Sequence, residues 1–171
     1  MKDDYTSKSP SAGRIGAAVE HLVAAACILA SDAELNVSTS LVDDEGVDLV
    51  FHRRGQSTTL AVQVKARSTD TSVLRRGQFT AFVREATFRP RADLFMLFVV
   101  VDRASARLTR CWFVPSTQFD RLAGATNRGT RRFVASNKEA TADQWSQWRL
   151  PFEQLPSIII EALEQLEAGR A

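Results

Sequence analysis

The sequence predicts a single α/β domain in which a central β-sheet is flanked by helices, and three observations support this prediction. Segments with helical spacing alternate with short apolar segments along the chain, and no Gly-, Pro- or Ser-rich linker divides them. The 171 residues, 44% of them hydrophobic, are enough for one compact domain with its own core. We expect residues 13–171 to form this domain and residues 1–12 to form a flexible polar tail.

The first part of the chain predicts one helix and three strands. Residues 14–30 are rich in Ala and apolar on nearly every side, which indicates a buried helix capped by Ser11. Residues 34–41 predict the first strand. Two segments with alternating polarity, 47–52 and 58–66, flank a Gly-containing turn and therefore predict a β-hairpin.

A second helix is expected after this hairpin. Phe79, Phe82, Val83 and Ala86 recur at spacings of three and four residues, the pattern of an amphipathic helix over residues 75–87.

The rest of the chain predicts two strands, a loop and two short helices. Residues 94–102 are an apolar run typical of a strand covered on both faces, and residues 110–114 predict another strand. The Gly- and Arg-rich segment 121–132 indicates an exposed loop, and residues 142–149 and 156–168 indicate short helices. The predicted order is α-β-β-β-α-β-β-α-α.

Missing signals exclude several classes of protein. The longest uninterrupted apolar run, residues 94–101, is far shorter than the ~18 residues of a membrane span. Cys27 and Cys111 are solitary and only two His residues are present, so neither a zinc cluster nor a disulfide framework is indicated. No GxxxxGK, GxGxxG or GxSxG motif occurs, which argues against a nucleotide cofactor and a serine hydrolase. We expect a cytoplasmic protein.

The charge is distributed unevenly, although the formal net charge is only +2. Residues 1–50 carry a net charge of −6 and residues 136–171 a net charge of −3. Residues 51–135 hold 16 basic side chains, 15 of them Arg, against five acidic ones, a net charge of +11. Such a segment is attracted to polyanions and favours bidentate phosphate contacts. A genomic bias toward Arg is the alternative explanation, but it would not by itself leave both flanks acidic.

The predicted hairpin brings three polar side chains together. Gln63 and Lys65 project from one face of its second strand, while the opposite face is aliphatic. Antiparallel pairing places Asp48, from the first strand, at the same end of the sheet. Taken singly, Asp48 is explained by a bond to the preceding turn and Lys65 by a position at the sheet edge. Taken together, these groups need polar partners when covered, which favours a functional site.

Glu20 is the only carboxylate in the predicted first helix. At about 100° per residue it shares a face with Gly16, Ala24 and Cys27, small residues that let a helix approach a sheet closely. Buried carboxylates are rare unless they are paired or bound to a metal. Two interpretations stay open: Glu20 points into a site, or its face is solvated or paired with an Arg.

These residues resemble a known active-site pattern. Glu20 in an N-terminal helix, followed by GVDLV at 46–50 and VQVK at 62–65 in a hairpin, is similar to the pattern of the PD-(D/E)XK nuclease superfamily. The similarity is to the QxK variant of Mrr-type restriction enzymes and some small resolvase-like proteins, and it covers about residues 12–118. It implies a restriction-endonuclease-like, three-layer fold with a central mixed sheet between helices.

The resemblance also implies a metal-dependent endonuclease. Asp48 would be the central ligand of Mg²⁺ or Mn²⁺, with the Gln63 amide, the Val64 carbonyl and Glu20 alongside. Lys65 would orient the attacking water and neutralise the charge that develops on the phosphate. The implied catalytic residues are therefore Glu20, Asp48, Gln63 and Lys65.

The chain departs from the superfamily pattern at two positions. Val47 precedes Asp48 where the pattern has Pro, and Gln63 replaces an acidic residue and so removes one negative charge from the site. The second departure keeps an alternative open. In that alternative the protein retains a nuclease fold without catalysis and acts as a DNA-binding or protein-interaction module.

DNA is the partner that both the resemblance and the basic segment imply. The arginines expected to bind phosphate are Arg53, Arg54, Arg67, Arg75, Arg76, Arg128, Arg131 and Arg132. No helix-turn-helix or zinc finger is evident, so structure-directed or weakly sequence-specific cleavage is expected. A homodimer is a further expectation, because small enzymes of this superfamily often cut both strands as dimers. Trp145, Trp148 and Phe152 would form its interface or belong to the core.

Overall fold

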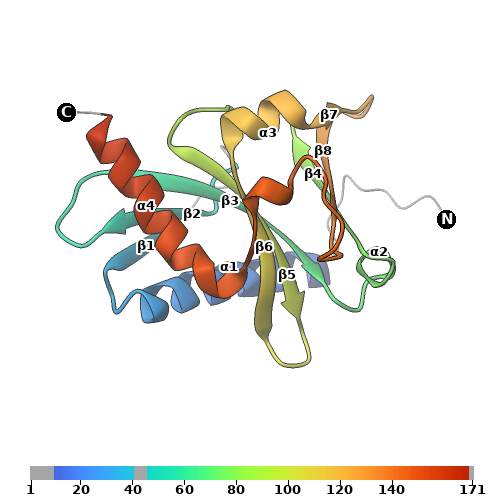
Figure 1. Ribbon diagram of the computed structural model, residues 1–171, viewed down its shortest axis with the longest axis horizontal. Helices are drawn as coiled ribbons and strands as arrows, with labels where there is room; N and C mark the ends of the chain where they lie inside the picture. Colours follow the sequence, from blue (N-terminus) through green and yellow to red (C-terminus); the bar gives the residue numbers. More distant parts are fainter. Residues whose placement is uncertain (1–9, 41–45, 170–171) are drawn as a thin grey trace.

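The structure is a computed structural model that describes residues 10–40 and 46–169 (Figure 1). Its helices are α1 (Pro10–Ala30), α2 (Ser72–Arg75), α3 (Ser116–Leu122) and α4 (Leu155–Ala168). Its strands are β1 (Leu35–Thr39), β2 (Leu49–Arg53), β3 (Thr59–Ser68), β4 (Gln78–Arg84), β5 (Leu94–Asp102), β6 (Arg107–Pro115), β7 (Gly124–Ala125), β8 (Thr130–Ser136) and β9 (Arg149–Pro151). Most of the predicted tail over residues 1–12 lies outside the described residues.

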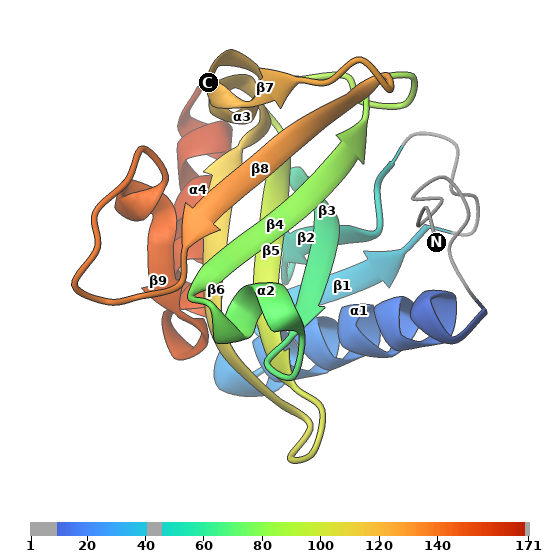
Figure 2. The ribbon, with the colours of Figure 1, turned by 90° about the vertical axis from the view of Figure 1, so that its right-hand side faces the viewer.

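Six strands form a central mixed sheet in the order β1-β2-β3-β5-β6-β9. Only β3 and β5 are parallel, while the other neighbouring strands in this sheet are antiparallel. Helices α1 and α4 pack on one face of this sheet, and a second sheet of β4, β8 and β7 packs on the other (Figure 1, Figure 2). The predicted α/β fold with a central mixed sheet and flanking helices is confirmed.

Alternation along the strands divides the hydrophobic core into two layers. Leu60, Val62 and Val64 of β3 pack with the helical layer, whereas Phe98 of β5 faces the second sheet. In that second layer the rings of Phe98 and Phe133 stack with their centroids 3.7 Å apart.

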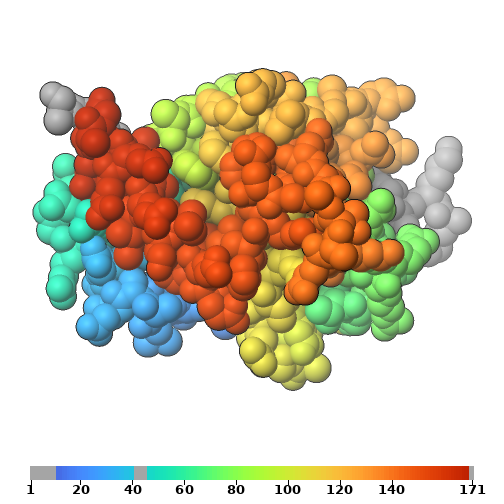
Figure 3. All heavy atoms as spheres, in the orientation of Figure 1, coloured from blue at the N-terminus to red at the C-terminus, as the bar shows by residue number. Residues whose placement is uncertain are grey.

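The aromatic residues considered for a dimer interface belong to these core layers. Trp145 is 1% exposed and Phe152 is 6% exposed, and Trp148 is partly buried against Trp145. The space-filling view in Figure 3 shows the C-terminal segment lying over this side of the molecule.

Helix α1 lies on the surface, so the prediction of a buried helix is wrong. One stripe, Val19, Val23 and Cys27, is buried against the sheet, whereas Leu29 is 80% exposed. The helix also has the length and composition of a membrane span, with a mean hydropathy of 1.5 and 17% of its residues buried. Its apolar character comes largely from Ala, which favours helix formation without needing core contacts. Ser11 lies inside the first turn and does not cap it.

Residues 75–87 form mainly a strand, so the predicted helix is wrong. Helix α2 ends at Arg75, and Gly77, with φ of +81°, redirects the chain into β4. Phe79, Ala81 and Val83 then alternate inward and pair with β8. The apolar residues of this segment fit both a helical and an extended period, and pairing with a strand about 50 residues later decides between them.

The partner of β4 arises in the segment predicted to be a loop. Residues 121–132 contain the end of α3, the short β7 and the first part of β8. Residues 142–149 form only a 3₁₀ turn at Ser146–Trp148 before β9, so that helix prediction is also wrong. The predicted strands at 47–52, 58–66, 94–102 and 110–114, and the helix at 156–168, are confirmed. The strand predicted at 34–41 is confirmed over Leu35–Thr39, and residue 41 lies outside the described residues.

Both cysteines are buried in the helical core layer as free thiols. Burial raises the pKa of Cys27 to about 12, and burial together with the nearby Cys27 and Glu153 raises the pKa of Cys111 further. We expect iodoacetamide at pH 8 to alkylate both thiols at least ~1,000-fold more slowly in the native protein than in urea, because the thiolate is scarce and covered. Equal rates in the two states would contradict this core.

Candidate functional site

Strand β3 extends beyond its neighbour β2, so within residues 10–40 and 46–169 one of its edges has no strand partner there and is called the open edge. Pairing with β2 ends at Leu49 opposite Val62, whereas pairing with β5 continues to Ser68. In an extended strand, the N–H and C=O of one residue point to the same side and those of the next residue to the other. The Val62 carbonyl accepts a bond from the Asp48 N–H at 3.0 Å. The backbone groups of Val64, two residues on, therefore face the open edge.

Asp48 is fixed at the start of this open edge. Its carboxylate oxygen Oδ2 accepts a hydrogen bond from the Val64 N–H at 2.6 Å. A charged acceptor on a backbone N–H makes a short, strong bond. The side chain thus takes the place of the strand partner that β2 no longer provides, and it holds a carboxylate beside the Val64 carbonyl.

Gln63 lies beneath the turn that carries Asp48. It is 6% exposed, and it directly follows Val62, the last residue of β3 that pairs with β2. Gly46 adopts a φ of +66°, and a methyl group at this position would lie 2.8 Å from Nε2 of Gln63. The Gln63 amide is therefore packed directly against the backbone of Gly46, which explains why this turn requires glycine.

A substitution at Gly46 tests this packing. Gly46→Ala brings both left-handed strain and a collision with Gln63. The control, Gly55→Ala, has the same strain, with φ of +77°, but open space around it. We expect Gly55→Ala to lower the free energy of unfolding by about 1–2 kcal/mol and Gly46→Ala by roughly 2 kcal/mol more, measured by urea denaturation. Equal losses would contradict the packing of Gln63 on Gly46.

A cavity of about 340 Å³ lies at the same edge of β3. Helix α1 lines it with Ile15, Gly16 and Glu20, and β3 lines it from Val64 to Ser68. Glu20 and Lys65, which come from different elements, thus line one cavity. The small Gly16 one turn before Glu20 is consistent with a close approach of this helix to the strand.

The structure places the other two predicted catalytic residues at the margin of this cavity. Asp48 and Gln63 are not among its lining residues. Asp48 reaches the cavity wall through its bond to Val64, whereas the Gln63 side chain packs against Gly46.

Lys65 is half-buried and shares a strand face with Gln63 and Arg67. Arg67 extends toward the second sheet, where its Nε donates to the Thr80 carbonyl at 2.8 Å. It also donates to its neighbour, the Ala66 carbonyl, at 2.9 Å. The cationic face of β3 thus runs from the cavity to the edge of β4.

Two charged cavity residues were not predicted from the sequence. Asp70 and Arg103 form an ion pair at the far end of the cavity. The neighbouring Ser68 hydroxyl and the Arg103 guanidinium hold the pKa of the Asp70 carboxyl below its usual range. The parallel pairing of β3 and β5 brings the two turns together, so only the strand order could have revealed the pair.

The donor atoms at the open edge suit a hard cation. They are the carboxylates of Asp48 and Glu20 and the carbonyl of Val64. Within residues 10–40 and 46–169, no group of three or more His, Cys, Asp or Glu is placed to hold a metal. Mg²⁺ and Mn²⁺ take one or two carboxylates and keep several waters, so this donor set fits them. Zinc needs a denser set of N and S ligands and does not fit.

The arginines predicted to bind phosphate fall into groups with different surroundings. Arg53 pairs with Glu34, Glu164 and Glu167 at 2.9, 3.0 and 3.7 Å, and so ties β2 to α4. Both Arg53 and the exposed Arg54 lie at the turn where β3 begins, whereas the cavity lies where β3 ends.

The remaining arginines lie on the side of the second sheet. Arg131 pairs with Asp120 at 2.9 Å and with Glu85 at 3.9 Å. The exposed ones are Arg75 and Arg76 next to α2, Arg128 before β8 and Arg132 in β8.

Comparison with known proteins shows the fold. No protein-family model and no curated protein sequence matches the chain. Among solved structures, the chain is similar to a bacterial homing endonuclease, I-Ssp6803I, with 17% sequence identity and a TM-score of 0.54. The similarity covers 95% of this chain and 99% of that chain. The two proteins therefore share a fold over nearly their whole length, while membership of the PD-(D/E)XK superfamily stays a prediction.

Proposed function

We propose that this protein is a metal-dependent endonuclease that hydrolyses phosphodiester bonds in DNA. The observation that carries the proposal is the open edge of β3, where the Asp48 carboxylate is fixed on Val64 and where Glu20 and Lys65 share one cavity. The fold shared with a homing endonuclease and the exposed arginines beside the second sheet give further support.

The residue types at this edge match the needs of phosphodiester hydrolysis. Asp48, Glu20 and the Val64 carbonyl would hold Mg²⁺ or Mn²⁺. When bound, the cation polarises a phosphoryl oxygen and makes water a better nucleophile. Lys65 places an ammonium group where it can hydrogen-bond the attacking water and stabilise negative charge on the phosphate. Gln63 as an amide ligand stays a prediction, and its packing on Gly46 favours a supporting role for the turn that bears Asp48.

The proposal is tested with an end-labelled DNA duplex incubated in Mg²⁺, Mn²⁺, Ca²⁺ or EDTA. We expect cleavage in Mg²⁺ or Mn²⁺ and intact DNA in EDTA, with branched and linear duplexes compared for substrate form. Intact DNA under every condition would contradict the proposal. Equal cleavage in EDTA and Mg²⁺ would contradict its metal dependence.

A second candidate function is that of a nuclease-fold module that binds DNA or protein without cleaving. The observation that favours it is the neutral Gln63 where the superfamily pattern has an acid, together with the few carboxylates at the edge. A titration with Mn²⁺ followed by electron paramagnetic resonance separates the two functions. The endonuclease binds Mn²⁺ at a site that Asp48→Asn removes, whereas the module has no Mn²⁺ site that depends on Asp48. Homodimer formation and a cytoplasmic location remain parts of the proposal.

A further inference from the structure

The second sheet has one buried face and one outward face. In β4 and β8, which we call the ribbon (Gln78–Arg84 and Thr130–Ser136), every second residue points into the core. The outward residues are Gln78, Thr80, Phe82 and Arg84 from β4 and Thr130, Arg132, Val134 and Ser136 from β8. Figure 2 shows the ribbon at the front of the molecule, beside β3.

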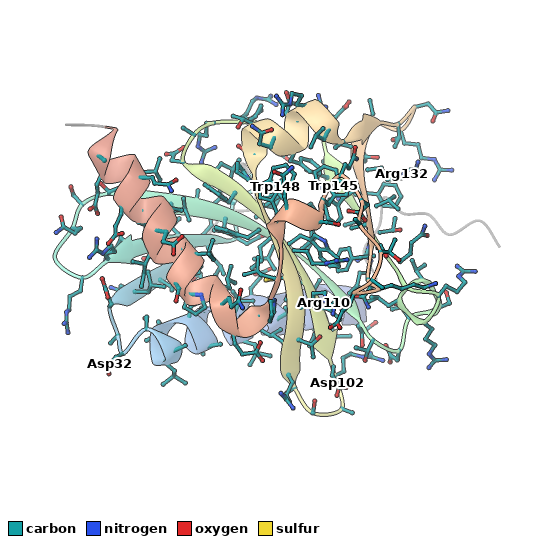
Figure 4. All side chains as sticks on the ribbon, in the orientation of Figure 1. Asp32, Asp102, Arg110, Arg132, Trp145 and Trp148 are labelled. Carbon is teal, nitrogen blue, oxygen red and sulfur yellow. The ribbon has the colours of Figure 1, made fainter. Side chains whose placement is uncertain are left out.

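Basic side chains stand toward both ends of this outward face, and Arg132 lies opposite Phe82, one pair in from the end. Arg84 and Arg132 are exposed at one end, and neither forms an ion pair within the part of the chain that the structure describes. Figure 4 shows Arg132 at the outer side of β8. At the other end Arg76 and Lys138 line a shallow cavity of about 390 Å³.

The acidic groups near the ribbon are already engaged. Asp143 lines the shallow cavity, but its carboxylate accepts bonds from the backbone N–H groups of Ser136 at 2.5 Å and Trp145 at 2.8 Å. Glu85 and Asp120 pair with Arg131, whose side chain points to the opposite side from that of Arg132. The outward face is therefore positive toward its ends, and its uncharged part lies around the Thr80–Val134 pair.

The dimensions of the ribbon match a groove of duplex DNA. Seven residues at about 3.4 Å each give a length of roughly 20 Å. The major groove is about 12 Å wide and admits a two-stranded β-ribbon, with a phosphate backbone along each side. In a ribbon that crosses this groove obliquely, cations toward the two ends can meet the two backbones while the uncharged Thr80–Val134 part faces base edges. There Thr80 lies opposite Val134, and their methyl groups suit contact with the methyl group of thymine.

The ribbon is also connected to the open edge of β3. Arg67 lines the 340 Å³ cavity, and its Nε donates to the Thr80 carbonyl in β4 at 2.8 Å. A duplex on the ribbon would thus lie next to the strand that lines this cavity.

We propose that the outward face of the ribbon lies in the major groove of duplex DNA next to the cleaved bond, with Arg84 and Arg132 on one phosphate backbone and Arg76 and Lys138 on the other. This inference rests on the proposed function, which supplies DNA as the ligand. It adds which surface of the protein binds the DNA and which groove of the DNA that surface contacts. It also predicts a preference for sequences containing thymine, which the sequence alone did not indicate.

The phosphate contacts are tested by measuring duplex affinity against KCl concentration in EDTA, where no cleavage is needed. We expect Arg84→Gln and Arg132→Gln each to reduce the slope of log K against log [KCl] by about 1, and the double variant by about 2. The control is Arg121→Gln, an exposed arginine on α3 that is bonded to Gln118. Unchanged slopes in the ribbon variants, equal changes in the control, or no DNA binding by wild type would overturn the proposal.

The groove contact is tested with duplexes in which uracil replaces thymine and so lacks the 5-methyl group. We expect wild type to bind these about threefold to fourfold more weakly per contacted methyl, and Val134→Ala to lose this discrimination. Equal affinity of wild type for both duplexes would overturn the groove contact. The two proposals fail separately. If the ribbon variants bind DNA more weakly but the wild-type protein does not cleave it, the ribbon proposal stands and the endonuclease proposal fails. If the ribbon variants bind DNA normally and the wild-type protein cleaves it, the endonuclease proposal stands and the ribbon proposal fails.

Discussion

Replacing Asp48 with Asn is expected to abolish DNA cleavage while the fold and DNA binding persist. Asn keeps an oxygen that can accept the hydrogen bond from the Val64 N–H, so the link between Asp48 and β3 survives. What it lacks is the negative charge that holds the cation. Because a bound cation contributes several kcal/mol to the transition state, the single-turnover rate should fall by roughly 1,000-fold or more.

The matched control for this variant is Asp102→Asn. Asp102 lies at the tip of the β5–β6 hairpin (Figure 4), where its carboxylate accepts bonds from the Ala104 N–H and the Ser105 hydroxyl. These bonds, the one from Ser105 foremost, keep the pKa of Asp102 below its usual range. Its loss of charge should leave the cleavage rate unchanged. If Asp48→Asn cleaved DNA at the wild-type rate, Asp48 would not belong to the catalytic site.

Replacing Lys65 with Met is expected to lower the single-turnover rate by about 100-fold to 1,000-fold. Met has similar length and fills the half-buried position, but it carries no charge to stabilise the phosphate. Affinity for Mn²⁺ should stay close to that of wild type, whereas Asp48→Asn should lose it. This difference separates a group that acts on the phosphate from one that holds the cation.

Two outcomes would contradict the role of Lys65. A cleavage rate equal to that of wild type would show that its charge is not used. If Lys65→Met lost both cleavage and the folded state, as measured by circular dichroism, Lys65 would contribute to stability and not to catalysis. Lys65→Arg is a second variant that keeps the charge but moves it, and we expect its rate to lie between those of wild type and Lys65→Met.

The parts of the site that sequence could predict are those set by strand alternation. Gln63 and Lys65 share a face of β3 because side chains alternate along a strand, and the hairpin brings Asp48 to the same part of β3, where it bonds Val64. Strand alternation alone does not predict the position of Glu20, because that position depends on how α1 packs. Gly16 and the stripe of small residues favoured the close approach that brings Glu20 to the cavity.

The parts that sequence could not predict depend on partners far along the chain. Arg53 lies in the basic segment, yet two of its three carboxylate partners come from α4, more than 100 residues later. The segment of β4 has apolar residues that fit two periods, and only the pairing with β8 makes it a strand. Because the sequence predicts a helix at β4, it predicts neither the ribbon nor the DNA-binding surface that we propose on it.

The central claim is that the open edge of β3 hydrolyses DNA with a bound cation, and conversion of supercoiled plasmid tests it most directly. Wild type in Mg²⁺ or Mn²⁺ is predicted to convert the plasmid to nicked and linear forms, whereas Asp48→Asn at the same concentration leaves it supercoiled. Supercoiled plasmid remaining intact with wild type, or equal conversion by wild type and Asp48→Asn, would contradict the claim.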